Sequence, residues 1–310
     1  METVKQMIID SLYRYAGEVL VEPTHIRVYD HHYDEENDEW PLQQLLDASE
    51  INPYEHTLIF NFNIHDDRFA KYNPICAPEF MAEQEADFKS FNIVPDWTNK
   101  TAVFNFSINK QRPHRIKLLT MIEELPLTNF TYSLPWLENP YSRLAVTNYM
   151  IGTETQMPQG IRSGSIQNCE TYKYLLQKNV YEPSCISLIS EPTYIEREAF
   201  LTEKTIMAIY GGTIPIWVGG WRCADALRIL GFDVFDDIVD HSYETLEDPW
   251  ARVRQAIFRN LDLLRNFTIT DAILTRLRSN LNLVLDGVFD QEVNRQLKGI
   301  PRAKELLQRL

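Results

Sequence analysis

The sequence predicts an α/β protein with two Rossmann-like, parallel-sheet domains that face each other across a cleft. Short apolar runs alternate along the chain with amphipathic segments, which is the pattern of strands alternating with helices. Apolar residues make up 44% of the 310 residues, which is enough for two ordinary cores and excludes a disordered chain. A proline-containing stretch ends near residue 100, so we expect domains over residues 1–100 and 101–310.

One clear strand marks the first domain. Residues 56–65 are rich in aromatic and β-branched types, and Asp66 and Asp67 follow directly. Ligands of open α/β sheets gather beyond the carboxyl ends of strands, which makes these two carboxylates our candidates for a catalytic general base. The alternative is a turn at the end of the strand with a helix cap.

The second domain is expected to open with a strand, a basic loop and a helix. Residues 101–107 form the predicted strand, and residues 113–124 form the predicted helix, with Pro113 where its missing N–H is not needed. A strand followed by a basic loop and a helix N-terminus commonly holds phosphate. Arg112 and Arg115 are therefore candidate phosphate ligands, and a solvated basic turn is the alternative.

Another acidic side chain follows a predicted strand later in this domain. Residues 185–190 are a short apolar run, and Glu191 comes directly after it. By the same rule, Glu191 is a candidate for contact with a nucleotide or its sugar. A capping role remains the alternative.

The strongest local pattern is a helix that leads directly into a strand. Glu203–Tyr210 has helical apolar spacing, Thr202 stands at its N-cap, and two glycines end it. Residues 213–218 are then an apolar run flanked by glycine, which is typical of a buried parallel strand. After residue 220 we expect a helix, a short strand over residues 232–235, and amphipathic helices over the last 60 residues.

Glu203 and Lys204 occupy the first turn of this helix. A helix N-terminus favours anions, and Lys204 adds a full positive charge for phosphate. The carboxylate of Glu203 can accept hydrogen bonds from the hydroxyls of a ribose or another sugar. Together they suit a ligand that carries both phosphate and sugar, although a capped surface helix with an acidic first turn has the same residues.

The motif around this helix resembles the signature of the family 10 glycosyltransferases, the α1,3-fucosyltransferases. Phe200 is followed after one residue by Thr-Glu-Lys over residues 202–204, by Ala208 four residues after Lys204, and by Thr-Ile-Pro-Ile-Trp-Val-Gly over residues 213–219. The match is close over residues 200–219 and loose over about half of the chain. It implies a two-domain fold of the GT-B type.

The resemblance also implies roles for individual residues. Glu203 and Lys204 would contact the ribose and diphosphate of a GDP-sugar, and Phe200, which replaces the more usual Tyr, would pack on the base. Arg115 matches the family's phosphate-binding arginine, with Arg112 as the competing choice. The implied enzyme is a glycosyltransferase that moves fucose or a related sugar, with inversion, from a nucleotide-diphosphate donor to a glycan or small hydroxyl acceptor.

No cofactor and no catalytic metal are expected on this basis, because the family binds its diphosphate through Arg and Lys. The pair Asp66-Asp67 is not the Asp-x-Asp metal motif of other glycosyltransferases. Asp30, His31, His32 and Asp34 include metal-binding residue types, but such a charged run is typical of a solvated loop.

Charge and hydropathy limit the partners and the location. Residues 1–100 contain 7 Lys and Arg against 20 Asp and Glu, which disfavours a DNA or RNA groove on that part of the chain. No apolar run reaches the roughly 18 residues of a membrane span, and no signal peptide is evident, so we expect a cytoplasmic protein. The four cysteines lack metal-ligand spacing and are interpreted as buried thiols.

Two other functions stay open at this stage. One is transfer of sugar onto a modified DNA base, as some viral glycosyltransferases perform. The other is a nucleotide-binding or interaction protein that has the same fold and no transferase activity.

Overall fold

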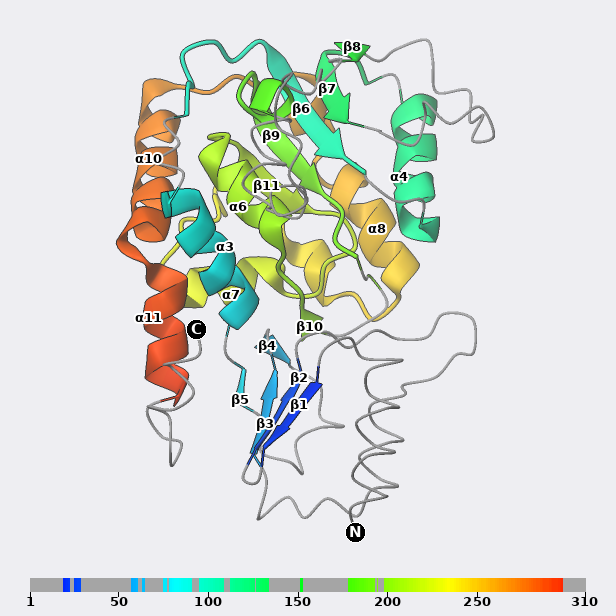
Figure 1. The fold of residues 1–310 in the computed structure, drawn as a ribbon. Coiled ribbons are helices and arrows are strands. Elements are labelled where there is room, and N and C mark those ends of the chain that lie inside the picture. Colours follow the sequence, from blue (N-terminus) through cyan, green and yellow to red (C-terminus); the bar gives the residue numbers. More distant parts are fainter. Residues whose placement is uncertain are drawn as a thin grey trace, which may run out of the picture.

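The protein has an α/β fold, with helices packed on strands that form three sheets (Figure 1). The computed structural model describes residues 19–22, 25–28, 57–60, 63–64, 75–76, 78–90, 95–108, 112–125, 127–133, 151–152, 178–192, 194 and 198–297. None of the helices in these ranges is long and apolar enough to cross a membrane.

The largest sheet has five strands in the order β11-β9-β6-β7-β8, and all neighbours pair parallel. The strands are β6 (Ala102–Ser107), β7 (Phe130–Ser133), β8 (Ile151–Gly152), β9 (Ser184–Ile189) and β11 (Ile214–Trp217). The chain lays β7 and β8 on one side of β6 and then returns to lay β9 and β11 on the other side. The direction of winding therefore reverses between β6 and β9.

Apolar side chains cover both faces of this sheet, as a parallel sheet requires. Ile214 and Ile216 face one core, which includes Leu118 of α4 (Pro113–Glu124) and Val253 of α8 (Pro249–Phe258). Trp217 faces the other core, together with most of α6 (Glu203–Tyr210). This alternation is the two-residue period of a strand, and because both faces are covered, residues 214–218 are all apolar.

A smaller sheet is formed by residues from the first quarter of the chain. Its order is β1-β2-β3-β5, made of Val19–Glu22, His25–Val28, Thr57–Phe60 and Ile75–Cys76. Only two residues separate β1 from β2, so this pair is antiparallel, whereas the other pairs are parallel as expected. The sheet is thus mixed.

The strand predicted over residues 56–65 is divided between two sheets. β3 ends at Phe60, and β4 (Asn63–Ile64) pairs antiparallel with β10 (Glu198–Ala199). This two-stranded ladder lies between the small and the large sheets in Figure 1. It joins the chain just before Asp66 to the chain just before Phe200.

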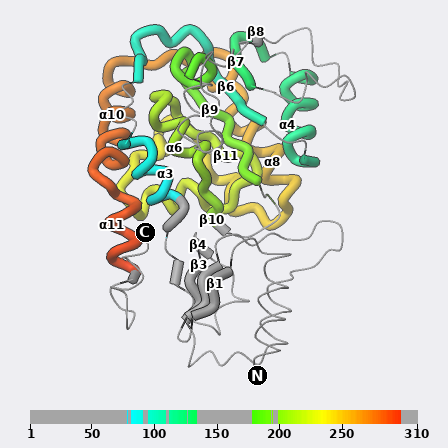
Figure 2. The backbone as a smooth tube through the Cα atoms, viewed as in Figure 1, coloured from blue at the N-terminus to red at the C-terminus, as the bar shows by residue number. Residues whose placement is uncertain are grey.

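The helix α3 (Glu79–Ser90) precedes the boundary expected at residue 100 but packs on helices from the end of the chain. It contacts α6, α10 (Asp271–Asp286) and α11 (Val288–Leu297). Figure 2 shows α3 and α11, far apart in sequence, lying side by side. Nearby, Trp97 is buried and its Nε1 donates a hydrogen bond to the carbonyl of Tyr210 at 2.8 Å.

The expected strand over residues 232–235 is wrong, because this segment is irregular. Side chains form hydrogen bonds with its backbone groups. The Asn280 side chain accepts a hydrogen bond from the Asp233 N–H at 2.9 Å and donates one to the Asp233 carbonyl at 2.7 Å. Asp233 in turn accepts from the N–H of Phe235, whose φ is +63°. A neighbouring strand is therefore not needed.

The helices expected toward the end of the chain are confirmed. They comprise α7 (Cys223–Ile229), α8, α9 (Leu261–Arg265), α10 and α11, and a 3₁₀ turn that was not predicted, η3 (Ser242–Thr245), precedes α8. Asp248 and Thr270 cap α8 and α10 through their side chains, as their positions before the apolar repeats would suggest. Cys185 and Cys223 are buried free thiols, as expected.

We predict that Gly212→Ala destabilises the protein more than Gly231→Ala. Both glycines have positive φ, at +60° and +90°, which costs an alanine about 1–2 kcal/mol. A Cβ on Gly212 would also lie 2.4 Å from the Trp97 ring, whereas one on Gly231 has open space. Denaturant unfolding should show an additional loss of about 1–3 kcal/mol for Gly212→Ala. Equal losses in the two variants would contradict this packing.

We also predict that Glu85 makes folding stability depend on pH. Burial raises its pKa from 4.5 to about 7, although its carboxylate accepts bonds from the N–H groups of Phe289 and Asp290 at the start of α11. Its stabilising contribution is therefore full below pH 4.5 and is lost as pH rises through 7.

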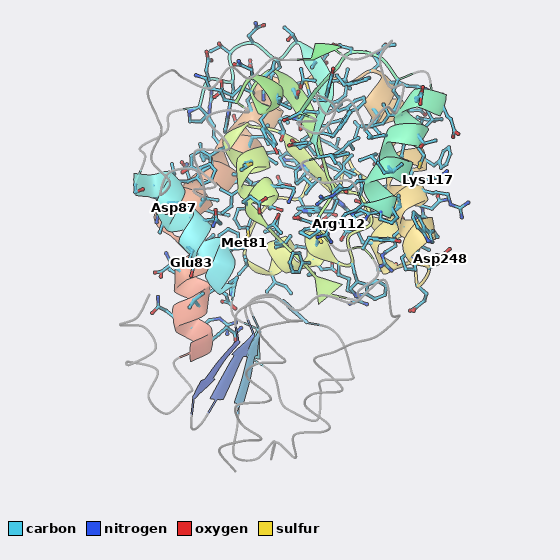
Figure 3. The ribbon with its side chains drawn as sticks, turned by 45° about the vertical axis from the view of Figure 1, so that its right-hand side comes forward. Met81, Glu83, Asp87, Arg112, Lys117 and Asp248 are labelled. Atoms are coloured by element: carbon cyan, nitrogen blue, oxygen red, sulfur yellow. The ribbon has the colours of Figure 1, made fainter. Side chains whose placement is uncertain are left out.

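The test is the melting temperature between pH 4.5 and 8 for wild type and Glu85→Gln. The variant should lose less stability as pH rises than wild type does. Glu83→Gln, the same change on an exposed position of α3 (Figure 3), should behave like wild type. If the melting temperatures of wild type and Glu85→Gln changed with pH in parallel, Glu85 would not be the source of the pH dependence.

Candidate functional site

The candidate site lies at the carboxyl edge of the large sheet, between β6 and β9. Parallel strands all end at the same edge, and the loops diverge where the winding direction reverses, which is where ligands of open α/β sheets bind. Residues after β6 lead into α4, and residues after β9 lead through β10 into α6. The predicted phosphate ligands belong to these segments.

Hydrogen bonds fasten the start of α4 to the loop after β9. Three side chains donate to three successive backbone carbonyls: Arg115 to Ser190 at 3.0 Å, His114 to Glu191 at 2.9 Å, and Arg112 to Pro192 at 2.5 Å. Figure 3 shows Arg112 at the start of α4, with Lys117 further along the same helix. These hydrogen bonds fix the guanidinium groups of Arg112 and Arg115 beside the point between β6 and β9 where the direction of winding reverses.

A buried carboxylate connects the same loop to α6. The side chain of Glu191 is 2% exposed and accepts hydrogen bonds from Thr202, from its N–H at 3.0 Å and from its hydroxyl at 2.6 Å. The ammonium of Lys204 lies 3.6 Å from the same carboxylate. Burial raises the pKa of Glu191, and the charge of Lys204 opposes that increase. Glu191 thus anchors the start of α6.

The first turn of α6 has its side chains paired with one another. Thr202 is the N-cap, and its hydroxyl accepts from the N–H of Lys204, as the sequence predicted. The Lys204 ammonium donates to the Thr202 hydroxyl and to the Glu203 carboxylate, each at 3.1 Å. Lys204 is only 8% exposed, so its charge is held at one place in the site.

Positive charge exceeds negative charge at this site. Arg112, Arg115 and Lys204 stand against the two carboxylates of Glu191 and Glu203. Burial lowers the pKa of Arg115 to about 10, which still leaves it charged at neutral pH. The excess suits an anionic ligand, because buried cations favour a partner of opposite charge.

His114 is a site residue that the sequence analysis missed. Burial and the neighbouring cations lower its pKa to about 3, so the ring is neutral, and it stacks on Tyr194 with 4.5 Å between ring centroids. Its Nε2 faces a carbonyl and therefore carries the proton. Within the described residues, His114 Nδ1 and Ser190 Oγ are buried without a hydrogen-bond partner, as occurs where polar ligands or waters bind.

The remaining predicted residues are only partly described. Phe200 is half-buried, directly after β10, and its carbonyl lies 3.8 Å from the Cys223 thiol. Asp66 and Asp67 lie outside the described residues, as do the loop residues from Asp30 to Asp34. The structure therefore brings together Arg112, Arg115, Glu191, Thr202, Glu203 and Lys204.

A hollow elsewhere on the surface is a weaker candidate. It measures about 500 Å³ and is lined by carboxylates that include Asp225, Asp236 and Asp237. Asp225 and Asp236 pair with Arg228, and Asp237 pairs with Arg276, so each of these carboxylates already has a cationic partner, and their excess over the arginines disfavours an anionic ligand. In the part of the chain that the structure describes, no group of three or more His, Cys, Asp or Glu side chains could hold a metal ion.

No protein-family model, curated protein or solved structure matches this chain. The resemblance to family 10 glycosyltransferases therefore depends on the motif residues themselves.

We predict that Thr202→Val destabilises the protein by about 2–4 kcal/mol, because it removes an N-cap and a hydrogen-bond partner of a buried carboxylate. Thr202→Ser retains the hydroxyl and should lose less than about 1 kcal/mol. Urea unfolding monitored by circular dichroism measures both values. If the valine variant were as stable as the serine variant, the hydroxyl would not hold Glu191.

Proposed function

We propose that the protein is a GT-B type glycosyltransferase that transfers fucose or a related sugar from a nucleotide-diphosphate donor, with a GDP-sugar favoured. The acceptor is a hydroxyl of a glycan or small molecule, and the reaction inverts the anomeric centre without a metal. The observation that carries this proposal is the convergence of Arg112, Arg115 and Lys204 at the switch between β6 and β9.

The donor diphosphate would bind between Arg115 and Lys204. Lys204 now bonds to Glu203, so phosphate binding exchanges that contact for a stronger one to a doubly charged group. The exchange frees the Glu203 carboxylate to accept hydrogen bonds from the ribose hydroxyls. Phosphate and ribose recognition are thus coupled through one side-chain pair.

Transfer proceeds by direct displacement. The acceptor oxygen bonds to the anomeric carbon while the bond from that carbon to the phosphate oxygen breaks, and the diphosphate leaves with the electron pair. A general base takes the acceptor proton, for which Asp66 and Asp67 are the candidates. Arg115 and Lys204 stabilise the charge that builds on the leaving group, with no metal required.

The arrangement of the sheets supports an acceptor domain formed by the first third of the chain. The small sheet contains only strands from residues 19–76, and the ladder of β4 with β10 links it to the chain that leads into α6. An acceptor held there would approach the donor from the side of Phe200. The acidic balance of residues 1–100 favours a neutral acceptor over a nucleic acid.

We predict that Lys204→Ala weakens GDP binding by roughly 10- to 100-fold, because one charge-assisted hydrogen bond is lost. Isothermal titration calorimetry without metal measures the dissociation constant. Lys178→Ala, which removes the same charge at an exposed position before the amino end of β9, should bind GDP like wild type.

Lys204→Ala leaves the buried Glu191 carboxylate without its cation and can destabilise the fold, so Arg115→Gln serves as a second variant. Circular dichroism checks that both variants are folded. Hydrolysis or transfer of a GDP-sugar by the wild type then separates an enzyme from a binding protein. The proposal fails if the wild type binds no nucleoside diphosphate, or if neither variant alters binding.

A further inference from the structure

A strained arginine follows the outermost strand of the large sheet. β11 leads through Gly219, Gly220 and Trp221 to Arg222, which has φ 51° and ψ 30°. Residues other than glycine are uncommon in this left-handed region, and those that persist cluster at binding sites. Arg222 lies at the same carboxyl edge of the sheet as the phosphate-binding residues.

The side chain of Arg222 is exposed, and its direction is restrained by a neighbouring ring. Its guanidinium carbon lies 5.8 Å from the centroid of Trp221, which is itself buried and contacts Arg252 at 5.2 Å. Among the residues that the structure describes, no carboxylate forms an ion pair with Arg222. Its planar set of donors is thus available to a ligand.

The N-terminus of α7 itself is not available. The N–H of Ala224 donates to the Glu244 carboxylate at 3.0 Å, and Glu244 is 2% exposed. Any ligand in this region would therefore meet the Arg222 side chain and not the backbone of the helix.

The residue that follows Arg222 lies next to Phe200 in the fold. Cys223, the adjacent residue, has its thiol 3.8 Å from the Phe200 carbonyl. Across the sheet the order is β11, β9, β6, so the cations of the phosphate site lie toward β6 and Arg222 lies toward β11. A nucleotide with its phosphates between Arg115 and Lys204 and its ribose at Glu203 would direct its base toward Phe200 and Arg222.

We infer that Arg222 recognises the base of the donor by donating two hydrogen bonds to the O6 and N7 acceptors of a guanine. This inference rests on the proposed function and adds to it the residue that selects the base. Arginine pairs with these two atoms in a bidentate geometry, whereas adenine presents an amino donor in place of O6. Arg222 is thus a specificity residue at the end of the site opposite Arg112.

The test is a set of dissociation constants for GDP, inosine diphosphate, ADP and 7-deaza-GDP, measured with wild type, Arg222→Gly and Arg222→Lys. Glycine removes the side chain and adopts the left-handed conformation without strain, so the variant should fold normally. Wild type should bind GDP and inosine diphosphate about tenfold or more tightly than ADP and 7-deaza-GDP. Arg222→Gly should bind all four with similar affinity, and Arg222→Lys, whose ammonium can also donate to O6 and N7, should retain part of the preference.

Arg278→Ala, which removes an exposed arginine on α10, serves as the matched control and should keep the wild-type preference. If Arg222→Gly weakened the binding of GDP and ADP equally, Arg222 would contact the phosphates and not the base. That result would overturn this inference and leave the proposed function intact. An unchanged preference in that variant would also overturn the inference. Absence of nucleotide binding by the wild type would instead defeat the proposed function together with the inference.

Discussion

The reversal of winding between β6 and β9 is the constraint on which the rest of the site depends. Parallel pairing brings both carboxyl ends to one edge, and the opposite directions of the following connections separate the two loops there. The three hydrogen bonds from the start of α4 to residues 190–192 then set the distance between them. Arg112 and Arg115 are thus positioned by the backbone of the adjacent loop and do not depend on a ligand to order them.

Burial of Glu191 couples this loop to α6. An isolated buried carboxylate would be strongly unfavourable, and here two bonds from Thr202 and the nearby Lys204 compensate for its lost hydration. The same side chains hold Lys204 at the helix start, where the dipole also favours an anion. The residues that stabilise this part of the fold are thus also those proposed to bind the donor, so a change in them is expected to affect both stability and binding.

Local patterns predicted those elements whose limits are set by nearby residues. The bounds of Glu203–Tyr210 and Pro113–Glu124 follow from apolar spacing, a cap and a helix-starting proline. The irregular segment over residues 232–235 could not be foreseen, because Asn280, far along the chain, satisfies its backbone. His114 was missed since a histidine between two arginines has no distinctive spacing, and its neutrality results from tertiary burial.

The most direct test of the proposed donor site is a crystal structure of the protein with GDP. We expect electron density for two phosphates between the guanidinium of Arg115 and the ammonium of Lys204, with Glu203 turned from Lys204 to the ribose. Nucleotide bound at another place on the surface, or a site with the Lys204–Glu203 contact intact at saturating GDP, would contradict it.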